Sequence, residues 1–531
     1  MSRGERREAV VIGAGAAGAV VAATLARRGI RVIVLEAGRR LDYAKDFVTY
    51  EPDWEIKGRM VFRMEDTRNE AVTIRGEPGF EVTRVRAVGG GTLHYAMNCD
   101  RFQPRDFRLR SLDGVGDDWP ISYHDLEPYY DRVEQDLGVA GEAGSPWEVP
   151  RNRYPNPPHR TGAATRAVAE GCRRLGIRTW THGVSALSRP TDDGRPACIY
   201  CLRCSVGCQI GAKSSVDLVY IRRGESQGLL EVRPNSSVLK IEIDLRGRAA
   251  GVVYADSGGR QHRLTADVVV LSGGSIESPR LLLNSASAAF PNGLANRNGL
   301  VGKFFMTHLN GGAVGLLPAR VDALPGLANG LTQDFRYTSK ERGYVGGWSA
   351  GFAGYAAPIA FAKYAMQRLG TRWGRAHLEF MRRYFGHYVA IGCDGEVLPS
   401  QDNFVDLDPD IRDGMGLPVA RIKFSVSGNE RAIWAHLNDT CTAILESAGC
   451  AEVQTAGFVA GSDGHYMGTC RMGMDAKTSV VDRWCRTHDI PNLFVVDGSC
   501  FVTSPALGPT LTIQALAMRT GEYIAAEARN I

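Results

Sequence analysis

The sequence lacks a long apolar run, since no window approaches the roughly 18 to 20 uninterrupted apolar residues that a membrane-spanning helix needs. It also lacks a strong charge of either sign: the formal net charge is +5 over 531 residues, and basic and acidic residues are interspersed. These absences argue against a transmembrane segment and against nucleic acid as a partner. The first residues lead straight into a predicted strand, without the apolar core and cleavage site of a signal peptide, so a cytoplasmic location is expected.

Cysteine is too sparse for a disulfide scaffold, and it is unevenly placed. Four of the 12 cysteines fall between positions 198 and 208. In a reducing compartment this clustering indicates metal or redox chemistry. Glycine, by contrast, is abundant at 62 residues, which suggests tight turns and close backbone approaches to a ligand. A chain of 531 residues with 44% apolar and 23% charged residues is expected to form two joined globular domains.

The N-terminal part predicts a βαβ unit and therefore an α/β fold. Apolar strands at 10–12 and 31–35 flank a helix of small residues at 16–28. Further elements are predicted from apolar patterning: a strand at 266–271 before a helix at 278–284, a smaller antiparallel layer at 230–243, helical pieces at 107–138, a surface connection at 141–160, strand-like alternation over 310–460, and a closing strand and helix within 492–526.

A glycine loop joins the first strand to the helix. Gly13, Gly15 and Gly18 form a GxGxxG whose glycines permit a tight turn, close backbone approach to a pyrophosphate, and close helix–strand packing. The helix N-terminus offers unpaired N–H groups to the phosphates. Glu36 ends the second strand, where a carboxylate can bind a ribose hydroxyl. The unit predicts a dinucleotide site, and by itself it leaves FAD and NAD open.

Five further segments narrow that choice: VGGGTLHYAMN at 88–98, GGSIESPRLLLNS at 273–285, HYMGTCRMG at 465–473, PNLFVVDGS at 491–499 and GPTLTIQALAMRTGEYI at 508–524. Together with the glycine loop they resemble the glucose–methanol–choline (GMC) family of flavin oxidoreductases. The matching segments keep the family's order over nearly the whole chain, and the middle, 310–460, is matched least. The resemblance implies FAD as cofactor and a Rossmann-like FAD-binding domain with a second α+β substrate domain, an antiparallel sheet with helices.

The resemblance also implies roles for individual residues. It assigns them to FAD in four groups: Gly13, Gly15, Gly18 and Glu36 at the ADP half, with Val238 at the adenine; Gly90, Gly91 and Thr92, after Gly89, around the central portion; Asp497 and Gly498 at the pyrophosphate and ribityl chain; Thr510 and Leu511 at the pyrimidine edge. His94 lies where some relatives carry a histidine bonded covalently to the flavin. We expect non-covalent flavin, with His94 packed near the ring.

His465 matches the catalytic histidine of the family. A base of near-neutral pKa is expected there, taking the hydroxyl proton as hydride leaves the carbon. The second catalytic position of the family, an Asn or His, is Gly508 in this chain. Losing one such contact can cost on the order of 100-fold or more in rate. Three explanations are open: a backbone group or water substitutes, another side chain such as His308 reaches in, or the substrate is unusually bulky.

The clustered cysteines, Cys198, Cys201, Cys204 and Cys208, form C-x2-C-x2-C-x3-C. Thiolates at this spacing can hold an iron–sulfur cluster. The segment also resembles that of GMC dehydrogenase subunits for glucose and fructose, whose C-x5-C-x3-C holds a three-iron cluster; Cys201 is then an additional ligand. We expect a 3Fe-4S or 4Fe-4S cluster. Structural zinc, a pair of disulfides and reduced thiols are the competing interpretations.

The expected domains are discontinuous. The FAD-binding domain comprises 1–110, 195–310 and 461–531, and the substrate domain comprises 111–194 and 311–460. A basic aromatic stretch at 371–388 is expected to be a helix with one apolar face on the core and arginines in solvent; an interfacial helix is the alternative.

The expected function is FAD-dependent dehydrogenation of a hydroxyl on a sugar, glycoside or polyol, with electrons leaving through the cluster or to an external acceptor. A small partner subunit or electron carrier is expected, and a periplasmic location only if that partner exports the complex. The alternatives are an alcohol oxidase that uses dioxygen, a lyase or isomerase that retains FAD, and an electron-transfer subunit without catalysis of its own.

Overall fold

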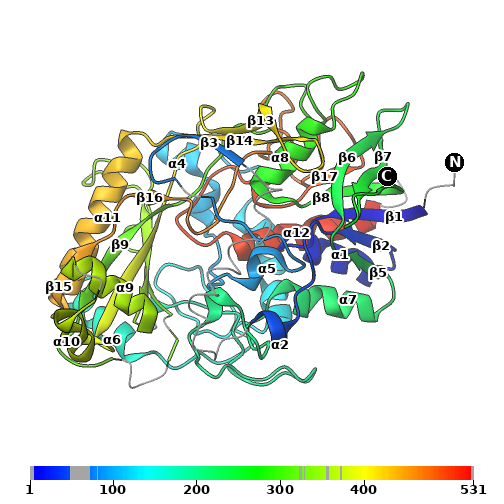
Figure 1. The fold of residues 1–531 in the computed structure, drawn as a ribbon. Coiled ribbons are helices and arrows are strands. Elements are labelled where there is room, and N and C mark those ends of the chain that lie inside the picture. Colours follow the sequence, from blue (N-terminus) through cyan, green and yellow to red (C-terminus); the bar gives the residue numbers. More distant parts are fainter. Residues whose placement is uncertain are drawn as a thin grey trace.

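A computed structural model describes residues 5–47, 72–80, 82–321, 326–327, 329–354, 358–370 and 373–527. Their strands form two seven-stranded sheets and one sheet of three strands. Figure 1 shows the first sheet on the right, near both ends of the chain, and the second sheet on the left, with helix α12 (Thr510–Glu527) between them. The predicted two-part α/β architecture is therefore formed, with a large sheet in each part.

The first sheet has a parallel centre whose apolar strands are buried on both faces. β1 pairs in parallel with β2 on one side and with β8 on the other, in the register Ala9↔Val32 and Ala9↔Val268. Continuous apolar runs suit such strands, because helices cover both faces of a parallel sheet. The strands of this sheet are β5 (Leu230–Arg233), β2 (Val32–Leu35), β1 (Glu5–Ile12), β8 (Gln261–Leu271), β7 (Ala249–Ala255), β6 (Ser237–Ile243) and β17 (Leu493–Val495).

The layer predicted at 230–243 differs from the observed arrangement. β5 pairs in parallel with β2 and extends the parallel sheet, so only β6 belongs to an antiparallel arrangement. β6 and β7 continue the same sheet through β8, which is long enough to pair with β1 along one part and with β7 along the other. A separate layer was predicted because apolar alternation does not reveal which neighbour a strand pairs with.

The second sheet is antiparallel and one of its faces is covered by helices. Its strands are β15 (Ala451–Thr455), β9 (Leu309–Leu316), β12 (Tyr388–Gly395), β11 (Trp348–Ala353), β10 (Gly330–Thr332), β4 (Trp180–Thr181) and β16 (Val459–Ala460). Helix α11 packs along β9, and Cys441 on that helix meets Cys393 of β12. The opposite face turns toward the first domain. The three-stranded sheet consists of β13 (Phe404–Arg412), β14 (Pro418–Phe424) and β3 (Val72–Gly76).

A helix near the C-terminus packs against helices from the N-terminal part of the chain. α12 packs against α1 and α5 in the core of the first sheet, with the Tyr130 hydroxyl 2.8 Å from that of Thr512. The described helices are α1 (Gly18–Arg27), α2 (Tyr43–Asp46), α4 (Leu109–Asp113), α5 (Tyr123–Leu137), α6 (Ala163–Arg174), α7 (Arg222–Ser226), α8 (Gly274–Asn284), α9 (Pro358–Leu369), α10 (Arg375–Tyr384), α11 (Gly428–Ser447) and α12. The residue boundaries of the two domains stay a prediction.

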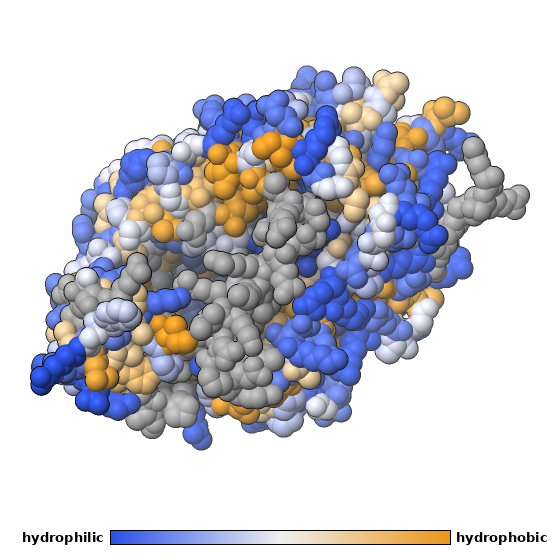
Figure 2. Space-filling view, in the orientation of Figure 1, coloured by the Kyte–Doolittle hydropathy of each residue, from blue (hydrophilic) through white to orange (hydrophobic). Residues whose placement is uncertain are grey.

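Only residues 375–384 of the basic aromatic stretch form the helix α10; 371–372 lie outside the described residues, and Tyr388 begins β12. Phe380 is buried in a small cluster with Phe361 of α9, and Arg382 and Arg383 face solvent, as expected. Among the helices that the structure describes, none has the length and apolar character needed to cross a membrane. Figure 2 shows hydrophilic and apolar residues interspersed over one face of the molecule.

Candidate active site

Glycine is required by the backbone in the first glycine loop. Gly13 has φ +98°, and a Cβ there would lie 2.5 Å from the carbonyl oxygen of Ser272. At Gly18, where α1 begins, a Cβ would lie 1.9 Å from the Gly13 carbonyl oxygen. A Cβ at Gly15 would lie 3.9 Å from the Cα of Gly90, so two glycine turns pack together. The predicted loop is formed, and the N-terminus of α1 beside it can bind an anion.

Glu36 lies where the first two strands end. Its carboxylate accepts hydrogen bonds from the backbone N–H groups of Ala14 and Gly38, both at 2.8 Å. The chain that leads into β6 runs alongside, because the N–H of Ser236 donates to the Glu36 carbonyl at 2.8 Å. Val238 follows two residues later and is half-buried. The residues expected at the ribose and the adenine thus lie at one edge of the sheet.

The second glycine turn is held firmly in place. Gly89 and Gly90 both have positive φ, and the Thr92 hydroxyl donates to the Gly89 carbonyl at 2.6 Å. Gly91 is exposed, and a Cβ there would meet no atom of the described chain within 4 Å. His94 follows directly and is buried; burial and the nearby Lys213 cation lower the pKa of His94 to about 4. A neutral ring beside the turn fits the expectation that His94 packs near the flavin.

The returning C-terminal segment reaches the same place. Asp497 accepts hydrogen bonds at its Oδ2 from the N–H of Gly274 at 2.9 Å and from the hydroxyl of Ser278 at 2.6 Å, both in the first turns of α8. Gly498 follows, and a Cβ there would lie 2.6 Å from the Tyr466 carbonyl oxygen. The other two residues expected at the cofactor begin α12: Thr510, which is half-buried, and Leu511, which is buried.

His465 forms a compact polar group with a carboxylate and a second histidine. Its Nδ1 lies 3.0 Å from Asp463 Oδ2 and 3.0 Å from His308 Nδ1. Burial lowers the pKa of His465, but the Asp463 carboxylate outweighs this effect, so the pKa rises to about 9. The ring is therefore mostly protonated at neutral pH, unlike the near-neutral base that was predicted. It must lose that proton before it can accept one from a hydroxyl.

His308 supports His465 from behind. Its Nε2 lies 3.0 Å from the Pro505 carbonyl oxygen and donates to it, which leaves Nδ1 as the acceptor facing His465. Asp394 Oδ2 lies 4.0 Å from the same nitrogen. Ligand atoms of His308, Asp394, Asp463 and His465 lie within 4.8 Å of one another, close enough for a divalent cation. The ring nitrogens at the centre already satisfy each other without one.

Gly508 lies beside His465, as the family pattern implies. A Cβ at this position would be 4.0 Å from His465 Cε1 and would meet no other atom of the described residues within 4 Å. His308 contacts the ring at Nδ1 and does not occupy this space. The absent side chain therefore leaves room next to the His465 ring.

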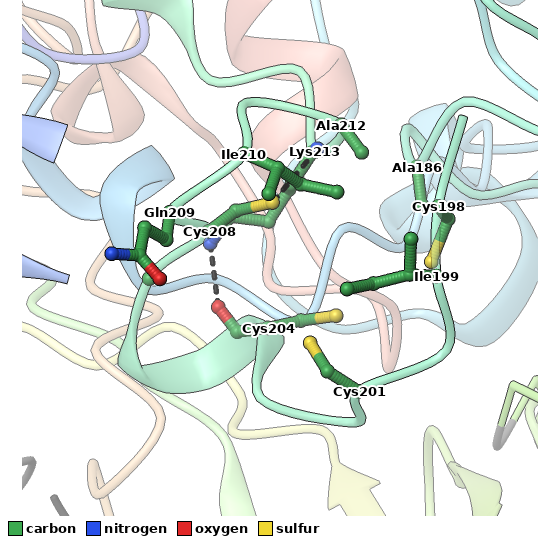
Figure 3. Close-up of a pocket in the computed structure, with 11 residues that line it drawn as sticks. Ala186, Cys198, Ile199, Cys201, Cys204, Cys208, Gln209, Ile210, Ala212 and Lys213 are labelled. Carbon is green, nitrogen blue, oxygen red and sulfur yellow. Dashed lines mark hydrogen bonds between the residues drawn. The ribbon is translucent and has the colours of Figure 1, made fainter. Parts of the chain in front are cut away.

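The four clustered cysteines surround one pocket, together with Ile199, Gln209, Ile210 and Lys213. Figure 3 shows Cys201 and Cys204 with their sulfur atoms turned toward each other and Cys198 turned toward the same space. All are free thiols, and Cys201 is exposed. Within the part of the chain that the structure describes, no three of these sulfur atoms lie within 4.8 Å of one another. That spacing is wider than a single tetrahedral zinc ion requires.

Lys213 connects this pocket to the second glycine turn. Its buried ammonium group donates to the carbonyl oxygens of Cys204 at 2.6 Å and Leu93 at 2.8 Å. Its backbone N–H donates to the sulfur of Cys208 at 3.4 Å (Figure 3), and the N–H of Tyr200 donates to that of Cys198 at 3.4 Å. N–H···S bonds and a nearby cation are features that stabilise thiolate ligands.

Asp463 and Asp394 did not emerge from the sequence. Asp463 stands two residues before His465, a spacing that is common by chance. The backbone N–H of His465 donates to the Asp463 carboxylate at 3.1 Å, a bond that forms only in this turn. Asp394 lies on β12, some 70 residues away along the chain. Only sheet pairing brings it beside His308, which precedes β9.

Comparison with known proteins gives matches along most of the chain. The family model for the N-terminal part of GMC oxidoreductases matches residues 7–310, and the model for the C-terminal part matches residues 399–517. The chain is 33% identical to a 2-methyl-1,2-propanediol dehydrogenase of Mycolicibacterium austroafricanum, over 98% of this chain and 95% of that protein. It is 29% identical to the fructose dehydrogenase large subunit of Gluconobacter japonicus, over 97% of each.

A solved structure shares the fold. The crystal structure of pyridoxine 4-oxidase from Mesorbium loti superposes with a TM-score of 0.65 and covers 97% of this chain and 99% of its own, at 17% sequence identity. At that identity the likeness concerns the fold alone.

Proposed function

Because this chain belongs to the GMC oxidoreductase family, whose members bind FAD and act on CH–OH groups, we propose that it is a dehydrogenase that oxidises a hydroxyl of a sugar, glycoside or polyol. The observation that carries this proposal is the pairing of His465 with Asp463 beside the open space at Gly508. FAD, when bound, would accept the hydride from the carbinol carbon. The turns around Gly15 and Gly90 and the N-terminus of α12 would hold it.

His465 removes the hydroxyl proton in this account. Asp463 and His308 hold the ring through Nδ1, which leaves Nε2 to face the substrate. Position 508 lies beside the ring on the Cε1 side, so the substrate approaches across a glycine. Only the deprotonated ring can act, and the carboxylate then compensates the charge that forms when the proton arrives.

The substrate class is supported by the relatives and by the space at Gly508. One matched relative is named for a diol with a tertiary alcohol carbon next to its primary alcohol, and another is named for fructose. Both compounds carry carbon substituents beside their hydroxyl-bearing carbons. A side chain at position 508 would lie next to His465 and would occupy the space that these substituents need.

We further propose that the four cysteines hold an iron–sulfur cluster that takes electrons from the flavin. Two features support this: the cysteines line one pocket, and Lys213 ties the pocket to the turn that would wrap the flavin. Ile199 and Cys201 are exposed at the outer rim, where a partner subunit or carrier could accept electrons. Such a route makes dioxygen a poor acceptor.

The test of the cluster is an anaerobic absorbance spectrum of the purified protein with iron and acid-labile sulfide assayed on the same sample. We expect flavin bands with a broad additional absorption and stoichiometric iron. Cys204→Ser should lose most of the iron and keep the flavin, whereas Cys450→Ser, at a half-buried cysteine outside the pocket, should keep both. A clean flavin spectrum without iron in protein kept from air would contradict the cluster.

The test of the dehydrogenase assignment is the choice of electron acceptor. Oxidation of hexoses or hexitols should proceed with an artificial acceptor much faster than with dioxygen. Hydrogen peroxide formed at the same rate as product would instead establish an oxidase.

A further inference from the structure

His182 is a buried histidine that the catalytic group does not use. It follows β4, and its side chain is 9% exposed. Its Nδ1 lies 2.6 Å from Asp100 Oδ2, and its backbone N–H donates to the Asn329 carbonyl at 2.8 Å. Its Nε2, however, is buried and has no hydrogen-bond partner among the described residues. Leaving a buried polar atom without a hydrogen-bond partner destabilises the folded state, so such an atom calls for an explanation.

The free nitrogen lies over a glycine surface of the second sheet, formed by Gly351 and Gly392. A Cβ on Gly351 of β11 would lie 3.7 Å from His182 Nε2 and would meet no other described atom within 4 Å. Gly351 pairs with Gly392 of β12, which is exposed although it lies in a central strand, and a Cβ there would meet nothing within 4 Å. Bare glycines in neighbouring strands of a sheet leave space for a ligand to approach the backbone.

The glycine surface extends along β12 toward His308 and His465. Asp394 lies two residues beyond Gly392 on β12, and side chains two residues apart in a strand point to the same face. Asp394 is the carboxylate 4.0 Å from His308, which contacts His465. The carboxylate also contributes to raising the pKa of His182; burial lowers that pKa, and Asp100 and then Asp394 outweigh it. His182 and His465 therefore stand at two ends of one surface.

We propose that His182, oriented by Asp100, is a second substrate-binding residue that hydrogen-bonds a hydroxyl remote from the one that is oxidised. Along β12, the distance from Gly392 to Asp394 is two strand residues, roughly 7 Å, and β11 with Gly351 lies one strand spacing farther away. A diol with hydroxyls on adjacent carbons is too short to bridge that length and also reach His465. A sugar ring or an extended hexitol is long enough. This inference rests on the proposed function and narrows it: the substrate is a monosaccharide or a polyol of similar length.

The test separates the two ring nitrogens of His182. In His182→Asn the amide stands where Nδ1 stood, so the bond to Asp100 is kept and the Nε2 group is lost; His182→Gln places an amide near the position of Nε2. With hexoses and hexitols, His182→Asn should raise KM about tenfold, the effect of losing one hydrogen bond of about 1.4 kcal/mol, with kcat little changed. His182→Gln should retain most of the affinity. The KM for 1,2-propanediol should stay unchanged in both.

The matched control is His262→Asn, which alters a histidine near the start of β8 in the first sheet, paired with Asp256 at 2.7 Å. This variant should leave the KM for hexoses and hexitols and the KM for 1,2-propanediol unchanged. Equal KM changes for short and long substrates in His182→Asn, or none, would overturn the proposal and make His182 structural.

A binding measurement keeps the two proposals apart. Calorimetry on the flavin-loaded enzyme gives the Kd of a hexitol under anaerobic conditions whether or not it is oxidised. A tenfold weaker Kd in His182→Asn, with no flavin reduction in the wild type, would uphold the subsite and contradict the proposed function. An unchanged Kd would overturn the subsite even where the wild type oxidises the sugar.

Discussion

At the scale of single residues, the proposed reaction depends on how strongly His465 holds its proton. The chain places three groups around its Nδ1, namely Asp463, His308 and Asp394, and the nearest carboxylate raises the pKa of His465 to about 9. A raised pKa makes the neutral ring a stronger base but also a rarer one at neutral pH. The pH dependence of turnover therefore reports on this group of residues.

We expect kcat/KM to rise with pH through an inflection near pH 9 and to level off above it, because the protonated ring cannot accept the hydroxyl proton. In Asp463→Asn the carboxylate that raises the pKa is gone, so the rise should move to lower pH. The plateau should fall by up to about 100-fold as the ring loses its orientation. The measurement is kcat/KM across this range for both proteins.

Asp256→Asn is the control for that substitution, because it removes the carboxylate of another histidine–aspartate pair, with His262. Its profile should match the wild type. An Asp463→Asn profile that keeps its inflection near pH 9 would show that a different group limits turnover.

Sequence reasoning located the residues of this site that lie in motifs, and it could not find those contributed by the sheet. His465, Gly508 and the cofactor glycines stand in recognisable segments, and the structure brings them together. Asp394 and His182 share a surface only through strand pairing, which apolar alternation does not specify. The near-neutral pKa predicted for His465 differs from the value near 9 for the same reason: burial and the Asp463 contact are properties of the fold.

At the scale of elements, the first glycine loop is tightly constrained at Gly13 and Gly18. The elements on either side were predictable, because a βαβ unit combines strong apolar runs with a helix of small residues. The strands that pair with β5 and β6 were not predictable, because the apolar alternation of β5 and β6 is compatible with either sheet. Tight packing at Gly18 makes the loop sensitive to a single methyl group.

Gly18→Ala should lower the melting temperature and the flavin content together. The new Cβ would lie 1.9 Å from the Gly13 carbonyl oxygen, so α1 must shift away from the loop. Overpacking of this kind costs about 1–3 kcal/mol. Thermal unfolding and the flavin-to-protein absorbance ratio measure the two effects.

Gly428→Ala, at the start of α11, is the matched control, because a Cβ there would meet no described atom within 4 Å. It should leave stability and flavin content unchanged. A Gly18→Ala protein with full flavin content and wild-type melting temperature would show that the loop tolerates a shift of α1.

At the scale of the whole molecule, both chain ends and the middle meet at one site between two sheets. The α1 loop comes from the N-terminal part, the cysteine pocket from the middle, and His465 with α12 from the C-terminal part. The long α12 crosses between the sheets (Figure 1) and packs on α1 and α5. In the proposed function, the thiol pocket connects to the second glycine turn through Lys213, and the substrate hydroxyl meets His465.

The central claim is that this enzyme takes a hydride from a sugar-length polyol, with His465 as the base. The most direct measurement is the flavin absorbance of the anaerobic, flavin-loaded protein during titration with hexoses and hexitols, for the wild type and for His465→Asn. We predict stoichiometric bleaching of the wild-type flavin by at least one of these compounds, and bleaching slowed by about 100-fold or more in the variant. A wild-type flavin that no hydroxyl compound bleaches, or an equal rate in both proteins, would contradict the account.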